Sequence, residues 1–190
     1  MNQMKITLLI IYMFYSCIPY EVVRDADKFE KTESIYLKYN FTDSKNCGSI
    51  HFFPRIHKGK DGQDYFLEIK YYGKDLVFIE QDQSLTMEID DKLFRFNGEA
   101  NSKWKTVHGD GSVTEIAIYS VIHFEEKNLK VTKLKANVIR QEDIKLISFA
   151  KKIDAKLSTR KGNCLFSLNE ENFENLQRFY NEEILGIPKK

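Results

Sequence analysis

Apolar and polar side chains alternate over many short stretches of the chain, and this pattern predicts β-strands. The clearest case is residues 65–72, where every second side chain is apolar: Tyr65, Leu67, Ile69 and Tyr71. Further strands are predicted at 35–41, 48–53, 75–80, 84–89, 92–96, 103–107, 112–124 and 129–139, the second of them ending at Pro54 and followed by a turn-rich loop at 58–64. About six to nine short strands separated by turns predict an antiparallel meander, folded into a sandwich or a partial barrel.

The C-terminal part of the chain changes to a helical period. A helix is predicted at 141–151, strands at 152–158 and 164–168, and a last helix after Asn169, whose side chain can cap it. The stripe along that last helix consists of Phe173, Leu176, Tyr180 and Ile184. The predicted class is therefore α+β, mostly β, with residues 35–190 forming a single β-rich globular domain closed by a helix–strand–strand–helix segment. This order resembles the closing segment of uncharacterised exported bacterial proteins, and the resemblance implies no specific activity.

The N-terminus has a different pattern. One positive charge, Lys5, precedes eleven uncharged and largely apolar residues that end at Ser16. These are the parts of a secretion signal. As a helix the apolar stretch would span about 16 Å, against about 30 Å for the hydrocarbon core of a bilayer. We therefore expect residues 1–16 to be a signal peptide rather than a membrane-spanning helix.

The residues Phe14-Tyr15-Ser16-Cys17 resemble the cleavage region of bacterial lipoprotein precursors, in the looser form used by spirochaetes. In that family the small residue permits cleavage and the cysteine becomes the lipid-modified N-terminus. Phe14 and Tyr15 depart from the aliphatic and small residues usual at those positions. The resemblance implies lipidation of Cys17 and attachment to a membrane of the bacterial cell envelope, on the periplasmic side of the outer membrane or at the cell surface. The alternatives are a plain signal peptide, or a buried N-terminal strand with a chance cysteine.

Residues 17–34 are charged and lack clean periodicity, which favours a lipid-anchored tether. An irregular first element of the domain is the alternative. Over the whole chain Lys and Arg number 29 and Asp and Glu 28, giving a formal charge of +1. This balance argues against nucleic acid as a partner, since non-specific binding to phosphates needs a basic excess.

With Cys17 assigned to the lipid, Cys47 and Cys164 remain. An even remainder in an exported chain favours a disulfide, and two separate buried thiols are the alternative. No zinc, calcium, phosphate-loop or nucleophile-elbow motif occurs, so neither a metal nor a cofactor is predicted. His51 and His123 could bind zinc only if they met Glu115 or Glu125 on one sheet face.

The aromatic side chains opposite the apolar face of 65–72 are the candidates for binding. They are Phe66 and Tyr72, and Lys70 and Arg95 would suit an anionic or sugar-like partner if they lay nearby. The sequence thus predicts an exported, lipid-anchored envelope protein that acts as a non-enzymatic binding or structural module, with a protein or small-molecule ligand as its partner. The main alternative is a carrier of a small apolar ligand in a barrel or sandwich pocket. An enzyme with a dispersed active site is a third.

Overall fold

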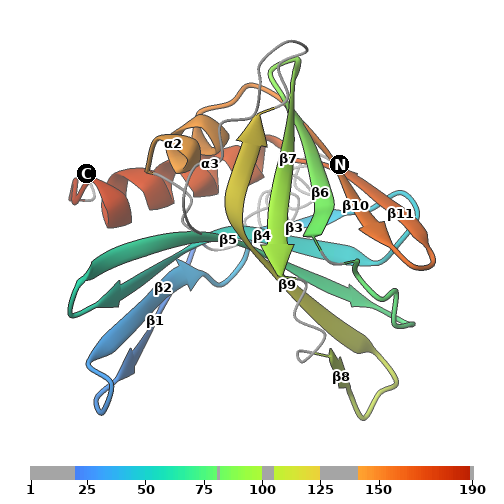
Figure 1. Cartoon of the computed structure of the whole chain (residues 1–190), viewed down its shortest axis with the longest axis horizontal. Coiled ribbons are helices and arrows are strands. Elements are labelled where there is room, and N and C mark those ends of the chain that lie inside the picture. Colours follow the sequence, from blue (N-terminus) through green and yellow to red (C-terminus); the bar gives the residue numbers. More distant parts are fainter. Residues whose placement is uncertain (1–19, 81, 100–104, 125–140, 189–190) are drawn as a thin grey trace, which may run out of the picture.

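The computed structural model describes residues 20–80, 82–99, 105–124 and 141–188. It confirms the predicted class, since a curled antiparallel sheet is closed by C-terminal helices (Figure 1). The strands are β1 (Val22–Asp27), β2 (Thr32–Leu37), β3 (Phe41–Asp43), β4 (Ser49–Gly59), β5 (Gly62–Gly73), β6 (Asp82–Ile89), β7 (Lys92–Glu99), β8 (Lys105–Val107), β9 (Val113–Phe124), β10 (Ile153–Thr159) and β11 (Gly162–Ser167). The helical elements are α2 (Gln141–Ser148), α3 (Glu170–Phe179) and the π-helical turn η1 (Tyr180–Ile184).

The strand order is β1-β2-β4-β5-β9-β7-β6-β10-β11, with β3 paired to β4 and β8 to β9. The sheet curls until β11 meets the segment that follows β3. There Ser44 bridges Phe166, the Lys45 amide donates to the Leu165 carbonyl at 2.9 Å, and Thr42 Oγ1 donates to the Ser167 carbonyl at 2.7 Å. Of the two predicted architectures, the structure therefore has the partial barrel.

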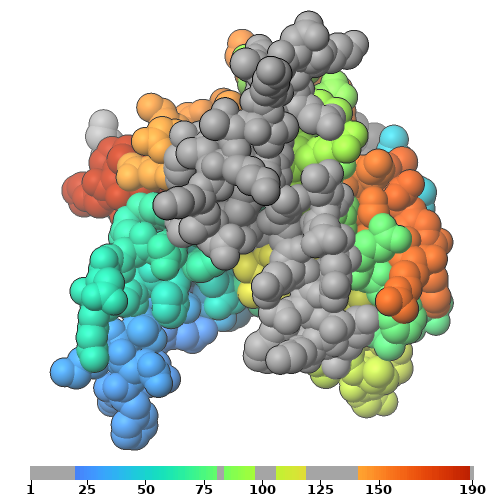
Figure 2. Space-filling model, in the orientation of Figure 1, coloured from blue at the N-terminus to red at the C-terminus, as the bar shows by residue number. Residues whose placement is uncertain are grey.

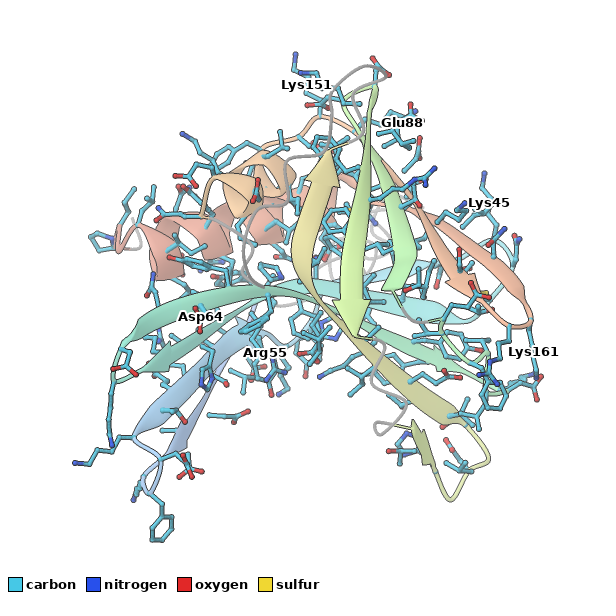
Figure 3. The ribbon with its side chains drawn as sticks, in the orientation of Figure 1. Lys45, Arg55, Asp64, Glu88, Lys151 and Lys161 are labelled. Atoms are coloured by element: carbon cyan, nitrogen blue, oxygen red, sulfur yellow. A yellow bond between two sulfur atoms is a disulfide. The ribbon has the colours of Figure 1, made fainter. Side chains whose placement is uncertain are left out.

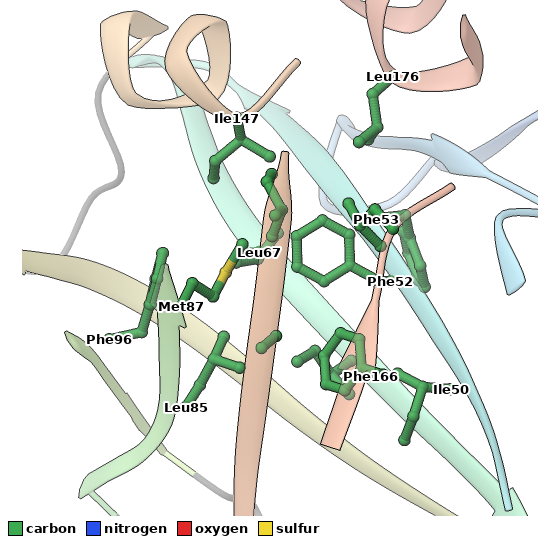
Figure 4. Packing of buried hydrophobic residues seen from close by; sticks show 14 of the residues in the cluster. Ile50, Phe52, Phe53, Leu67, Leu85, Met87, Phe96, Ile147, Phe166 and Leu176 are labelled. Atoms are coloured by element: carbon green, nitrogen blue, oxygen red, sulfur yellow. The ribbon is translucent and has the colours of Figure 1, made fainter. Parts of the chain in front are cut away.

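The inner face of the curled sheet carries the core. Along β5 the inward side chains are those predicted from the alternation, Tyr65, Leu67, Ile69 and Tyr71, all buried. The helices α2 and α3 add Ile147 and Leu176 to the same cluster. Figure 4 shows these two side chains above the core side chains of the strands. Asn169 caps α3 as predicted, because it accepts from the Asn172 amide while the Asn172 side chain accepts from the Asn169 amide.

The segment 17–34, predicted as a tether, contains β1 and the first residues of β2. These two strands form an antiparallel hairpin that continues the sheet through β4. The four outer residues of β1, from Arg24 to Asp27, are exposed. Because this edge strand buries so little, its sequence shows no alternation, and charged residues on an edge also discourage pairing with other chains.

Pro54 does not end its strand as the sequence predicted. Instead β4 runs from Ser49 to Gly59 and turns tightly into β5, so the expected loop at 58–64 is a hairpin. On its other side β4 pairs with β3 only as far as His51 and with β2 only from Arg55 onward. Pro54 lies between these two ladders, where no partner strand needs a backbone N–H from it, so the proline costs no hydrogen bond of the sheet. The strand predicted at 129–139 lies outside the described residues.

Candidate functional site

The outer face of β4 and β5, turned away from the helices, carries an unusual number of aromatic and charged side chains. Arg55 lies on this side of the sheet in Figure 3. We call this set the aromatic face: Tyr36 from β2, Phe41 from β3, His51, Phe53 and Arg55 from β4, and Phe66, Glu68, Lys70 and Tyr72 from β5. Strand pairing places the members side by side, since Arg55 is opposite Phe66, Phe53 opposite Glu68, and His51 opposite Lys70.

A buried carboxylate holds two cations at the centre of the aromatic face. Glu68 is 1% exposed, and its Oε2 lies 2.6 Å from Arg55 Nη2 while its Oε1 lies 3.4 Å from Lys70 Nζ. The local charge of these three groups is therefore positive. A carboxylate this buried is tolerated because it is paired, and removing it would leave two cations without compensation.

Both cations also lie against aromatic rings. Arg55 Cζ is 4.5 Å from the centre of the Tyr36 ring. Lys70 Nζ is 5.2 Å from that ring centre and 5.1 Å from the centre of Phe53. These distances lie within the range of cation–π attraction. The side chains of Arg55 and Lys70 keep 25% and 18% exposure, so neither is fully enclosed by the protein.

The imidazole of His51 lies between two aromatic rings on the same face. Its ring centre is 4.6 Å from that of Phe41 and 4.2 Å from that of Phe53. The residue is 2% exposed, and its Nε2 has no hydrogen-bond partner in the described part of the chain. Burial, together with the positive charge of Lys70, lowers the pKa of His51 from 6.5 to about 3. His51 is therefore neutral near pH 7 and adds no charge to the face.

Three of the four residues predicted for binding lie together on the aromatic face, and the fourth does not. Phe66, Lys70 and Tyr72 point outward from β5, since the alternate side chains of that strand fill the core. Arg95 is on β7, separated from β5 by β9. Sequence spacing could not show that Arg95 lies apart from the other three residues, because β5 and β7 pair with largely different parts of β9.

Arg95 instead lines a groove of about 480 Å³ on the outer face of β6, β7, β10 and β11. The groove also contains the exposed side chains Leu93 and Leu165, the cations Lys45 and Lys156, and the carboxylates Glu88 and Asp154. Its charges are mixed, and Asp154 already bonds Lys152 and Ser167. These bonds, that to Lys152 first, lower the pKa of Asp154.

Cys47 and Cys164 form a disulfide with their Cα atoms 5.4 Å apart. The bond joins the turn between β3 and β4 to β11, beside the main-chain bonds that bring the two ends of the sheet together. Cys47 also lines an open cavity of about 770 Å³ at this end of the sheet, together with Tyr72 and Lys74. Cys17 lies outside the described residues.

Among the described residues, no group of three His, Cys, Asp or Glu side chains could hold a metal ion, and Glu125 lies outside those residues. Glu115 has a different role. Its carboxylate is 1% exposed and accepts hydrogen bonds from the backbone amides of Val77, Phe78 and Ile79, at 2.5, 2.8 and 3.0 Å. It thereby fixes the connection between β5 and β6, where Phe78 has a positive φ of 56°.

Sequence reasoning missed six members of the aromatic face: Tyr36, Phe41, His51, Phe53, Arg55 and Glu68. His51 and Phe53 do alternate with buried residues of β4, but two apolar faces on one strand give a continuous apolar run rather than a clear period.

No helix among the described residues is long and apolar enough to cross a bilayer. Comparison with models of protein families, with curated proteins and with solved structures gave no match.

Proposed function

We propose that this chain is an exported, lipid-anchored protein of a bacterial envelope that acts as a non-enzymatic binding module. The anchor part of the proposal rests on the sequence from Lys5 to Cys17. The disulfide between Cys47 and Cys164 supports export, because such bonds persist in oxidising compartments and are rare in the cytosol.

The observation that carries the binding part is the position of Lys70 on the aromatic face. Its side chain is 18% exposed, its ammonium group lies over the rings of Tyr36 and Phe53, and it shares the single carboxylate of Glu68 with Arg55. Aromatic surfaces beside a cation suit a partner with an anionic group and a flat apolar surface, such as an acidic sugar. For this reason we keep the proposal of an anionic or sugar-like partner for the surface that contains Phe66, Lys70 and Tyr72.

The packing of the interior argues against the carrier alternative. Phe52 and Phe166 meet inside the curled sheet with ring centres 6.4 Å apart, and they belong to one cluster of buried side chains that also includes Met87 and Leu176. The cavity volumes given above belong to open surface grooves. A carrier of an apolar molecule needs an enclosed pocket of several hundred Å³.

Metabolic labelling with a tagged fatty acid tests the anchor. We expect the wild-type protein, expressed in its bacterial host, to carry the label and to sediment with membranes. Cys17→Ala should lose the label, whereas Cys47→Ala in the same experiment should keep it. Equal label in the wild type and Cys17→Ala, or none in either, would contradict the proposal.

Binding to a sulfated oligosaccharide, measured by calorimetry, tests the aromatic face. Lys70→Met should weaken binding about tenfold, which corresponds to the loss of one charge-assisted contact. Lys156→Met, in the groove that contains Arg95, is the matched control and should leave binding unchanged. Equal losses for the two variants would show that the sugar binds by net charge alone.

A further inference from the structure

The first described residue is fixed against the C-terminal helix. The ring of Tyr20 lies 4.0 Å from the guanidinium carbon of Arg178, and Glu182 and Glu183 are close enough to act on its hydroxyl electrostatically. Burial, followed by the charges of Glu182 and Glu183, raises the pKa of Tyr20, which stays protonated. Two residues later β1 begins and pairs with β2. The chain is therefore held in place from Tyr20 onward.

This position limits where a lipid on Cys17 can lie. Cys17 precedes Tyr20 by three positions, and three extended steps along the chain span at most about 11 Å. An acyl group on Cys17 inserted in a bilayer would therefore keep the surface around Tyr20 close to the lipid headgroups. The predicted tether of residues 17–34 would have allowed any orientation, but the hairpin of β1 and β2 removes most of that length.

The C-terminal helix on which Tyr20 packs, and α2 beside it, expose large apolar side chains. Leu146 and Phe149 belong to α2 and its end, and Leu185 and Ile187 follow η1, with exposures between 38% and 49%. The Leu185 amide bonds the Tyr180 carbonyl, and the Phe149 ring packs edge-on to Tyr180 with centres 5.6 Å apart. Figure 2 shows α2 and the C-terminal helix together on one side of the molecule, with β10 and β11 on the opposite side.

The two carboxylates of η1 are turned back onto the protein. Glu182 pairs with Arg178, and Glu183 pairs with Arg24 of β1, which leaves the two carboxylate side chains 15% and 10% exposed. Their charge is thus neutralised locally. α2 also carries the exposed Glu142 and Lys145, which are opposite in charge. The exposed Leu, Ile and Phe side chains, together with the paired carboxylates of η1, suit this surface to the headgroup region of a bilayer.

We propose that the helical side of the domain, formed by α2, η1 and residues 185–187, lies against the membrane that holds the lipid anchor. Leu146, Phe149, Leu185 and Ile187 enter the headgroup region, and the groove between β7 and β11 faces away from the bilayer. This inference rests on the lipid anchor of the proposed function. It adds an orientation, and therefore states which surface is open to partners.

Fluorescence on vesicles tests this orientation. Lipidated protein is reconstituted into phosphatidylglycerol–phosphatidylcholine vesicles after Leu185→Cys, Phe29→Cys or Leu93→Cys substitution and labelling with an environment-sensitive dye. Leu93 is the matched control, because it is exposed to 41%, close to the 47% of Leu185. Phe29, 97% exposed in the turn between β1 and β2, tests whether this hairpin contacts the bilayer instead. Nitroxide-bearing lipids in the same vesicles report proximity to the bilayer.

We expect the dye at position 185 to shift to the blue and to be quenched at least threefold more than the dye at position 93. Equal quenching at 185 and 93, or quenching at 29 without quenching at 185, would overturn the orientation. Mass measurement of the same samples separates the two proposals. Lipidated protein with an aqueous dye at position 185 refutes the orientation alone, whereas an unmodified Cys17 refutes the anchor and with it the orientation.

Discussion

Acidification should destabilise the folded protein through His51. In the folded state burial lowers the pKa of this imidazole to about 3, against 6.5 for an ordinary histidine. As the pH falls below 6.5 the unfolded chain binds a proton that the folded protein does not bind. The free energy of unfolding therefore has its full value above this pH and decreases as the pH falls, until the folded imidazole also protonates near pH 3.

The size of the effect follows from the same two pKa values. Each pH unit between them lowers the free energy of unfolding by about 1.4 kcal/mol. Between pH 7.5 and 4.5 the loss is about 2.5 kcal/mol. Among the described residues, the carboxylates with lowered pKa are those of Asp27, Asp110 and Asp154, which add their losses only below the ordinary value of 3.8 and so do not contribute within this window.

Urea unfolding followed by tryptophan fluorescence at several pH values measures this slope. His51→Phe keeps a flat ring between Phe41 and Phe53 and removes the proton, so its stability should change by less than about 1 kcal/mol over the same window. His57→Phe, a half-buried histidine further along β4, is the control and should retain the slope of the wild type. Equal slopes in the wild type and His51→Phe would refute the assignment of the effect to this residue.

Three further predictions concern groups that hold the fold. Replacing Cys47 and Cys164 together by alanine should lower the free energy of unfolding by on the order of 4–5 kcal/mol in the chain-entropy model, because the bond closes a loop of 117 residues; denaturant titration under oxidising conditions measures this, and no change would contradict it. Glu115→Gln should lower the free energy of unfolding by about 2–4 kcal/mol, because a neutral amide with one acceptor oxygen cannot accept all three backbone N–H bonds. Hydrogen exchange at residues 77–79 should become faster, and unchanged exchange there would refute the prediction. Glu68→Gln should cost about 3–5 kcal/mol by leaving two cations unpaired, whereas Glu33→Gln, whose ion pairs are exposed and 3.7 Å long, should cost less than about 1 kcal/mol; similar losses for both would contradict the central role of Glu68.

The strands that lie with one face in the core could be predicted from the sequence. The alternation in 65–72 identifies the inner face of β5, and the capping residue Asn169 marks the start of α3. Both signals are local, because a half-buried strand or a helix end is specified by side chains within a few positions. The same alternation places Phe66 and Tyr72 on the opposite face of the strand.

Features that depend on distant segments were not predictable. Pro54 is acceptable in β4 only because β2 and β3 leave a gap opposite it, and no neighbouring residue contains that information. The sequence likewise could not show that Glu68 meets Arg55 across a strand pair, or that Arg95 lies in a different groove from Lys70. The pairing of β1 with β2 was missed because an exposed edge strand has no apolar face to reveal it.

The most direct test of the account is the intact mass of the mature protein isolated from the membranes of its bacterial host. We predict a chain that begins at Cys17, carries the added mass of a lipid modification on that residue, and is two hydrogens lighter than the fully reduced chain because of the bond between Cys47 and Cys164. A measured mass that equals that of a chain without lipid, whichever residue is its first, together with recovery of the protein in the soluble fraction, would contradict the claim that this domain is held at a membrane by Cys17.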